Sequence, residues 1–286
     1  MTVSSEDFRR ALRACAIAAL AACSSDHAVG PTAVDAVRPG FDTSLYPGDA
    51  AMRAWRQPGS PYRWVGYYLP ASCHRDASWT GHRAGLAADG WGMAVLYVGQ
   101  QAWDVTASRA VPNATVRATG PLARAAEATR VVAAAVTCSQ SLLTAAQGTT
   151  EADDAIARTV AEGFPRGTTI FLDIERMSAI PSTMHAYYRA WVRRVLADGR
   201  FRPGVYVHAS NADAIRSGIV GEYAAAGVDG AAAYWITGGS GFALDRAPGD
   251  VGLAYASAWQ GRLDVARQWN GVTLTIDESV ANGTGF

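Results

Sequence analysis

From residue 39 onward, short apolar segments alternate with stretches of helical periodicity. Apolar runs bounded by turn residues predict buried strands, whereas apolar positions three or four residues apart predict amphipathic helices. On this basis we expect eight strands, at residues 40–42, 64–69, 93–98, 169–175, 204–208, 232–236, 254–259 and 272–277. Helices are expected between most of them, at residues 49–56, 81–88, 151–163, 182–197 and 211–225. This alternation is typical of parallel βαβ units, and eight strands favour a closed α/β barrel, the (β/α)8 or TIM barrel, over an open sheet.

Local signals refine the helix ends and the domain limits. Ser182 and Asn211 are expected to be N-caps, and Gly199 and Gly227 occupy positions where left-handed C-caps favour glycine. Residues 238–252 show no helical pattern and are expected to form a loop. A long insertion is expected at 101–148, and its second half, 122–146, is Ala-rich and helical in pattern. We therefore expect one barrel domain over 39–286 that carries a helical insertion after the third strand.

Residues 1–38 differ in character from the rest of the chain. Arginines precede an apolar run from Ala14 to Cys23, and the run ends in a sequence that looks like a bacterial lipobox. This interpretation predicts an exported lipoprotein of the cell envelope, lipidated at Cys23 and followed by a polar linker over 24–38. The alternative is an Ala-rich amphipathic helix on a cytoplasmic protein, with Ser4 or Ser5 as its cap. Export would leave Cys73 and Cys138 to form a disulfide; otherwise they are buried thiols.

Composition then narrows the possible chemistry. The chain has 286 residues, is 49% hydrophobic and 17% charged, and has a formal net charge of zero. No basic patch indicates nucleic acid, and all 25 basic residues are arginine. The absence of lysine excludes P-loop, kinase, Schiff-base and pyridoxal-phosphate chemistry. The histidines and cysteines lack metal-ligand spacing, so neither a metal nor a cofactor is expected. Asp, Glu, Tyr and Trp remain, and these side chains are typical of proteins that act on sugars.

The most informative segment is the end of the fourth predicted strand, where Asp173 and Glu175 are two residues apart. Side chains alternate along a strand, so both carboxylates should point to the same side, about 6–7 Å apart along it. At the C-terminal end of a barrel strand, such a pair suits glycosidic chemistry, in which one carboxyl must carry a proton. Taken alone, an Asp-x-Glu pair is more often simply an exposed acidic strand end.

Two further carboxylates are expected to join this pair. Asp42 lies in the first predicted strand and Asp277 ends the last, and these two strands are neighbours in a closed barrel. Four like charges at one end of a barrel repel one another, so their retention points to function. Aromatic residues near other strand ends offer flat faces for sugar rings, although each is individually more typical of core: Tyr67, Tyr97, Tyr206, Trp235 and Trp259.

Several of these segments together resemble a known family. They are Gly40-Phe-Asp-Thr-Ser, Trp64-Val-Gly-Tyr-Tyr-Leu, Val95-Leu-Tyr-Val-Gly-Gln-Gln101, Phe171-Leu-Asp-Ile-Glu175, Gly204-Val-Tyr-Val-His, Tyr234-Trp-Ile, Ala258-Trp-Gln260 and Ile276-Asp277. Their order resembles that of a bacterial glycoside-hydrolase-like TIM-barrel family of unknown function, which is itself similar to the family 25 lysozymes, the muramidases. The resemblance spans residues 39–286 apart from the insertion.

The resemblance implies roles for individual residues. Glu175 would be the general acid, and Asp173 would support the acetamido group of the substrate or the charge of the transition state. Asp42 and Asp277 would line the sugar subsite, and Gln260 would join the aromatic residues in binding substrate. The implied function is hydrolysis of peptidoglycan, without a metal. Two alternatives remain: a catalytically silent glycan-binding or envelope protein on the same barrel, or a cytoplasmic structural protein.

Overall fold

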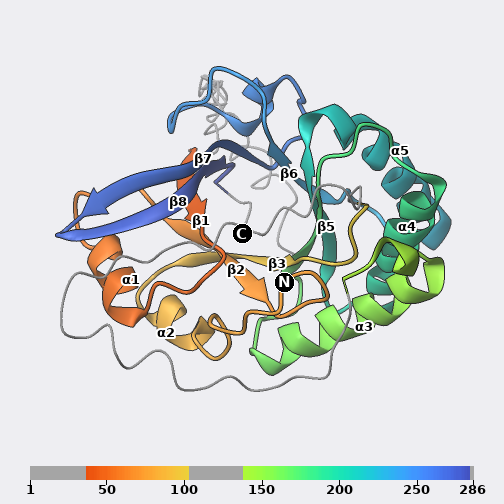
Figure 1. The fold of residues 1–286 in the computed structure, drawn as a ribbon, viewed down its shortest axis with the longest axis horizontal. Coiled ribbons are helices and arrows are strands. Elements are labelled where there is room, and N and C mark those ends of the chain that lie inside the picture. Colours follow the sequence, from red (N-terminus) through yellow and green to blue (C-terminus); the bar gives the residue numbers. More distant parts are fainter. Residues whose placement is uncertain (1–36, 103–137, 284–286) are drawn as a thin grey trace, which may run out of the picture. The chain divides into compact units, whose positions relative to one another are not determined.

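The computed structural model describes residues 37–102 and 138–283. Eight strands form a closed barrel in the order of the sequence, which confirms the predicted α/β barrel (Figure 1). The strands are β1 (Arg38–Asp42), β2 (Trp64–Leu69), β3 (Gly92–Tyr97), β4 (Thr169–Ile174), β5 (Arg202–His208), β6 (Ala233–Thr237), β7 (Ala258–Trp269) and β8 (Val272–Ala281). The helices are α1 (Asp49–Arg56), α2 (Arg83–Ala88), α3 (Ala145–Ala161), α4 (Ser182–Asp198) and α5 (Ala209–Ala226), with short 3-10 turns η2 (Gln140–Leu142) and η3 (Pro248–Val251).

The last strand departs from a regular (β/α)8 barrel. Strands β1 to β7 are parallel to their neighbours, but β8 is antiparallel to both β7 and β1. The reason lies in the turn Asn270–Gly271, whose φ angles of 47° and 78° are those of a two-residue hairpin turn. A turn this short returns the chain beside β7 and leaves no room for a helical crossover. The expectation of parallel βαβ units is therefore wrong for β8.

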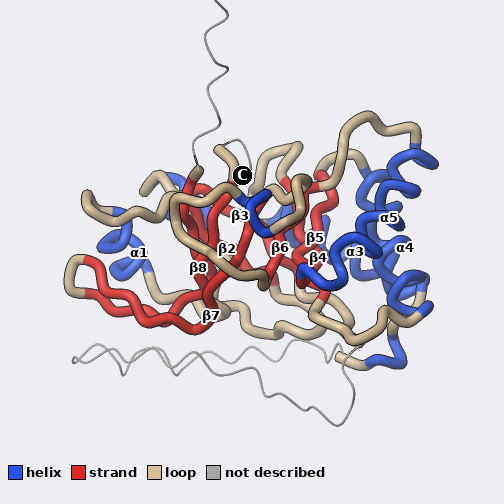
Figure 2. Tube along the Cα trace, turned by 90° about the horizontal axis from the view of Figure 1, so that it is seen from above, coloured by secondary structure: helices blue, strands red, loops and turns tan. Residues whose placement is uncertain are grey.

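The β7–β8 hairpin continues beyond the barrel and packs outside it (Figures 1 and 2). Near its turn, the Trp55 indole of α1 donates a hydrogen bond to the Val272 carbonyl at 3.1 Å. Where β8 pairs with β1, the buried Glu278 carboxylate accepts hydrogen bonds from Tyr62 at 2.6 Å and from Arg262 and Arg267 of β7 at 2.8 and 2.7 Å. These charge-assisted bonds link β7 to the part of β8 that lies in the barrel wall.

The barrel interior has an aromatic part and a polar part. The aromatic part is filled by Trp64, Phe171 and Trp235. The rings of Trp64 and Trp235 meet edge to face, with their centroids 5.1 Å apart. Gly40 permits this packing, because a Cβ there would overlap the Trp64 ring. The polar residues Asp42, Tyr68, Asp173, Tyr206 and Gln260 lie nearer the C-terminal ends of the parallel strands. The interior is therefore a packed core that carries a polar group at one end.

Helices α3, α4 and α5 lie side by side against the strands (Figure 1). Helix α3 begins at Ala145, six residues before the predicted start, so its first turn lies within the segment assigned to the insertion. At the end of this first turn, Gly148 lies so close to the Tyr187 carbonyl of α4 that a Cβ would overlap that carbonyl. Close approach of the two helices thus depends on this glycine.

The predicted C-caps Gly199 and Gly227 are confirmed, with left-handed φ angles of 69° and 64°. The predicted N-caps are wrong. Ser182 is already the first residue of α4, and α5 begins earlier than expected, so Asn211 lies within the helix. Its side chain instead bonds both the N–H and the carbonyl of Met177 at 3.0 Å, fixing the loop after β4.

Cys73 and Cys138 form a disulfide, one of the two outcomes considered from the sequence. Within the described part of the chain, no helix has the length and hydrophobicity needed to cross a bilayer. Residues 1–36, with the predicted lipidation site Cys23, lie outside the described residues, as does most of the predicted helix over 122–146.

Candidate active site

Four carboxylates lie near one end of the barrel, and the strand directions explain how they meet. Asp42 is the last residue of β1, Asp173 lies near the end of β4, and Glu175 follows that strand directly. Asp277 lies within β8 and pairs directly with Asp42 across the antiparallel ladder. Because β8 enters the barrel where β1 ends, an aspartate in the middle of β8 lies at the same end of the barrel as Asp42. The expected adjacency of these two residues is therefore observed, with the strand direction reversed.

Asp42 is fixed by hydrogen bonds from the barrel interior. It is 4% exposed, and its carboxylate accepts a hydrogen bond from the Tyr68 hydroxyl at 2.7 Å and another from the Gln260 amide at 2.6 Å. The Gln260 oxygen in turn accepts hydrogen bonds from Tyr206 at 2.5 Å and Thr237 at 3.1 Å. Burial, and then the charge of Asp277, raises the pKa of Asp42 well above its usual value despite these bonds.

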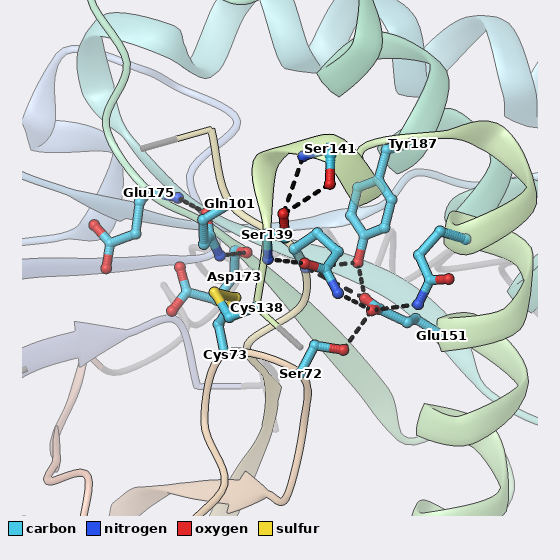
Figure 3. Close-up of a disulfide and its surroundings, with 12 residues drawn as sticks. Ser72, Cys73, Gln101, Cys138, Ser139, Ser141, Glu151, Asp173, Glu175 and Tyr187 are labelled. Carbon is cyan, nitrogen blue, oxygen red and sulfur yellow. Dashed lines mark hydrogen bonds between the residues drawn. A yellow bond between two sulfur atoms is a disulfide. The ribbon is translucent and has the colours of Figure 1, made fainter. Parts of the chain in front are cut away.

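Asp173 is buried differently, because part of its carboxyl is unpaired. It is 8% exposed, and its Oδ1 atom has no hydrogen-bond partner among the described residues. Burial, followed by the charges of Glu175 and Asp42, raises its pKa well above the usual value. Glu175 is exposed, and Figure 3 shows both carboxyl groups extending to the same side of the strand end. The pair thus combines a buried group that favours its neutral form with an exposed group that solvent can reach.

Asp277 completes the group. It is partly buried, and its carboxylate accepts a hydrogen bond from the Asp264 N–H at 2.7 Å. Burial raises its pKa to about 6; the hydrogen bond opposes this rise, and the charges of Asp264 and Glu175 add to it. The charge of Asp277 thus raises the pKa of Asp42, and the charge of Glu175 raises the pKa of Asp277. The charges of Glu175 and Asp42 both raise the pKa of Asp173. Asp42, Asp173 and Asp277 therefore titrate as members of an interacting set rather than independently.

The aromatic residues predicted to bind sugar divide into two groups. Tyr206 faces the interior and bonds Gln260, so it lies beside the carboxylates. Tyr67 and Tyr97 face the helices instead, where their hydroxyls bond Glu162 and Asp154. For these two tyrosines the predicted contact with substrate is wrong, since their rings lie on the outer face of the sheet.

The predicted substrate contacts of the two tryptophans are also wrong. Trp235 is buried in the barrel core, and Trp259 is buried on the outer side, where it bonds the Gly238 carbonyl at 2.7 Å. Neither ring has a face available to a sugar. The residue that sequence reasoning missed is Tyr68, the immediate neighbour of Tyr67, which faces the interior and holds Asp42. Side chains alternate along a strand, so these two tyrosines lie on opposite faces of β2, and the face toward the interior is that of Tyr68.

A second interior feature that sequence reasoning missed is Gln101, just after β3. It is 2% exposed, and its amide bonds the main chain on both sides of Ile174 (Figure 3). The Cys73–Cys138 disulfide lies next to it in the same view. Over residues 37–102 and 138–283, no cluster of three or more His, Cys, Asp or Glu is arranged to hold a metal ion. The side chains described above at this end of the barrel carry carboxyl, hydroxyl and amide groups.

A family model for the Rv2525c-like, glycoside hydrolase-like domain matches residues 53–281, which is most of the chain. The protein belongs to this family. The match includes three of the four carboxylates and begins after Asp42. It agrees with the family resemblance inferred from the strand-end motifs. No curated protein is detectably similar in sequence.

Solved structures share the barrel of this Rv2525c-like domain at low sequence identity. An uncharacterised protein from B. stearothermophilus is 17% identical, with 87% of this chain and 98% of that chain covered and a TM-score of 0.52. The modular autolysin LytC from Streptococcus pneumoniae is 12% identical, with 85% of this chain and 46% of that chain covered and a TM-score of 0.50. At these identities the likeness concerns the fold alone.

Proposed function

We propose that this protein is a glycoside hydrolase that cleaves the glycan of peptidoglycan by carboxylate acid–base catalysis. The observation that carries the proposal is the convergence of Asp42, Asp173, Glu175 and Asp277 at the strand ends, three of them with a raised pKa. Burying like charges together costs stability, and barrel enzymes place their catalytic groups at these strand ends. A pair of carboxyls with different environments is what glycosidic hydrolysis requires.

In the proposed mechanism, Asp173 and Glu175 share one proton in the resting protein, because two adjacent carboxylates do not both ionise readily. Glu175 is exposed and delivers the proton to the glycosidic oxygen as the bond from that oxygen to the sugar C1 breaks. Asp173, then ionised, stabilises the positive charge that develops on the sugar ring. Water adds hydroxide to C1 and returns its proton to the carboxylate pair, so the protein is regenerated.

The remaining site residues bind the sugar in this proposal. Asp42 is held in one orientation by Tyr68 and Gln260, and so presents a fixed acceptor to sugar hydroxyls. Asp277 and Tyr206 contribute acceptors and donors beside it. Peptidoglycan is favoured because the motifs resemble those of a glycoside-hydrolase-like family that is itself similar to the family 25 lysozymes, and because an autolysin shares the fold.

Export to the cell envelope fits the same function. The Cys73–Cys138 disulfide supports export, because disulfides persist in oxidising compartments and are rare in the cytosol. We propose that residues 1–38 direct export, that lipidation at Cys23 anchors the protein to the membrane, and that the barrel domain begins near residue 39.

The test is release of reducing ends from purified peptidoglycan between pH 4 and 8. We expect turnover by the native protein and a loss of about a thousandfold or more in Glu175→Gln, which removes the proton donor and keeps the shape. Glu162→Gln is the matched control, because Glu162 lies at the end of α3 and bonds Tyr67 on the outside of the barrel. Full activity is expected in this control.

Absence of turnover by the native protein on walls of several compositions contradicts the enzymatic proposal. Retention on the glycan without turnover, unchanged in Glu175→Gln, identifies a glycan-binding protein instead. Equal loss of activity in the Glu162 control shows that the Glu175 effect is not specific to the site.

A further inference from the structure

The Gln101 side chain bridges the main chain at the end of β4. Its Nε2 donates a hydrogen bond to the Asp173 carbonyl at 2.8 Å, and its Oε1 accepts one from the Glu175 N–H at 3.0 Å. This is the pair of bonds that a neighbouring strand would supply. The β3–β4 ladder ends at Tyr97 and Leu172, so the main chain of β3 no longer pairs with β4 beyond that point. The Gln101 amide therefore continues the ladder by one step, next to both carboxylates.

The Asp173 carboxyl depends on this main-chain support. Its Oδ1 has no hydrogen-bond partner among the described residues, so no side-chain bond orients that atom. On the other side, β5 pairs with Asp173 and Ile174 and stops short of Glu175. The bond from the Glu175 N–H to Gln101 thus supports the main chain where β5 no longer does.

The residue before Gln101 is itself held by several hydrogen bonds. The adjacent Gln100 donates from its main-chain N–H to the Tyr187 hydroxyl at 3.0 Å, and from its side-chain amide to Glu151 at 2.7 Å. The Ser139 N–H donates to the Gln100 side-chain oxygen at 2.8 Å, directly after Cys138 of the disulfide (Figure 3). Gln100 is thus held by hydrogen bonds to helices α3 and α4, while the Gln101 side chain bonds the end of β4.

We propose that Gln101 is a positioning residue, which holds the main chain of residues 173–175 so that both carboxyls face the substrate together. The proposal rests on the hydrolase function proposed above. A carboxyl displaced by a fraction of an ångström transfers its proton poorly, while substrate is still bound by the rest of the site. Loss of Gln101 should therefore lower kcat much more than it changes KM.

The first experiment does not depend on activity. Gln101→Met keeps the side-chain length and removes both hydrogen bonds. Gln57→Met is the matched control, since Gln57 is exposed after α1 and its amide bonds the Arg53 carbonyl. By NMR on labelled protein, we expect the Glu175 amide of Gln101→Met to exchange with solvent at least about tenfold faster, as loss of one hydrogen bond implies. The titration midpoint of the Asp173 carboxyl should move, and the control should match the native protein. Unchanged exchange and titration overturn the proposal.

The second experiment measures hydrolysis of soluble glycan strands prepared from peptidoglycan. For Gln101→Met we expect kcat to fall about 10- to 100-fold with KM changed less than about threefold. In Gln101→Glu, the neutral side chain can make both bonds and the ionised one cannot, so its kcat relative to the native protein should fall as pH rises. Two results would indicate a purely structural role. One is a ratio of the Gln101→Glu kcat to the native kcat that does not change with pH. The other is a loss of kcat in both variants that is accompanied by a matching loss of thermal stability. If the native protein is inactive, the hydrolase proposal fails, while the NMR result still decides whether Gln101 holds the strand end.

Discussion

Replacing Asp277 by asparagine should stabilise the protein at pH 8 and leave its stability at pH 4 unchanged. The carboxyl of Asp277 has a pKa of about 6 in the folded protein, against an ordinary value of 3.8. Burial is the main cause, and the charges of Asp264 and Glu175 add to it. A raised pKa means that folding favours the neutral form, so the stabilisation is complete below about pH 4 and is lost as pH rises through 6.

The size of the effect follows from the difference of about two between the pKa of Asp277 in the folded protein and its ordinary value. Each unit corresponds to about 1.4 kcal/mol, so ionisation of Asp277 costs the folded state about 3 kcal/mol at pH 8. Asparagine is neutral at every pH, and its oxygen can still accept the hydrogen bond from the Asp264 N–H. Its substitution also removes a charge that raises the pKa of Asp42. The gain in the free energy of unfolding should therefore approach about 3 kcal/mol at pH 8.

The assay is urea denaturation of both proteins at pH 4 and pH 8. Asp229→Asn is the control, because Asp229 is exposed in the loop before β6 and should change little at either pH. A variant that is equally stable or less stable than the native protein at pH 8 refutes the argument, as does a gain of the same size at both pH values. If the carboxylates serve catalysis, the stabilised variant should also turn over glycan more slowly. The charge of Asp277 would then lower the stability of the native protein but be needed for its activity.

Three further variants test how the barrel is held together. Glu278→Ala should lower the free energy of unfolding by about 1.5–3 kcal/mol, measured by urea denaturation, because two arginines and a tyrosine lose their shared acceptor while the arginines stay partly solvated. Replacing Cys73 and Cys138 by alanine should cost about 4 kcal/mol for a closed loop with a sequence separation of 65, and a cost near zero would contradict an entropic role. Gly148→Ala should lower the melting temperature despite the better helix propensity of alanine, because the new methyl group meets α4; a higher melting temperature would show that the helices separate without cost.

Much of the fold follows from local sequence. Two predicted elements, 49–56 and 64–69, have the observed limits of α1 and β2, and Gly199 and Gly227 end their helices as expected. These features depend on hydrophobic periodicity and on the left-handed backbone that glycine tolerates, and both are properties of a few neighbouring residues. The direction of β8 also had a local signal, Asn270–Gly271, which is typical of a tight hairpin and was overlooked.

Which face of a strand meets the barrel interior was decided only by the tertiary structure. Both faces of a barrel strand are buried, one by the interior and one by the helices, so hydrophobicity does not distinguish them. The alternation separated Tyr67 from Tyr68, but packing alone showed that Tyr68 bonds Asp42. The same ambiguity explains the outward positions of Tyr97 and Trp259.

The spacing of Asp173 and Glu175 determined by itself that two carboxyls would lie on one side of a strand. Their environment came from residues far away in the chain. Gln260 reaches Asp42 across 218 positions, and Gln101 reaches the Asp173 carbonyl across 72. Sequence periodicity describes neighbours within one element, whereas burial and hydrogen bonding set each pKa through contacts that exist only after the barrel closes. The sequence by itself thus determined where the acids lie, and the tertiary structure decided which of them are held, buried and protonated.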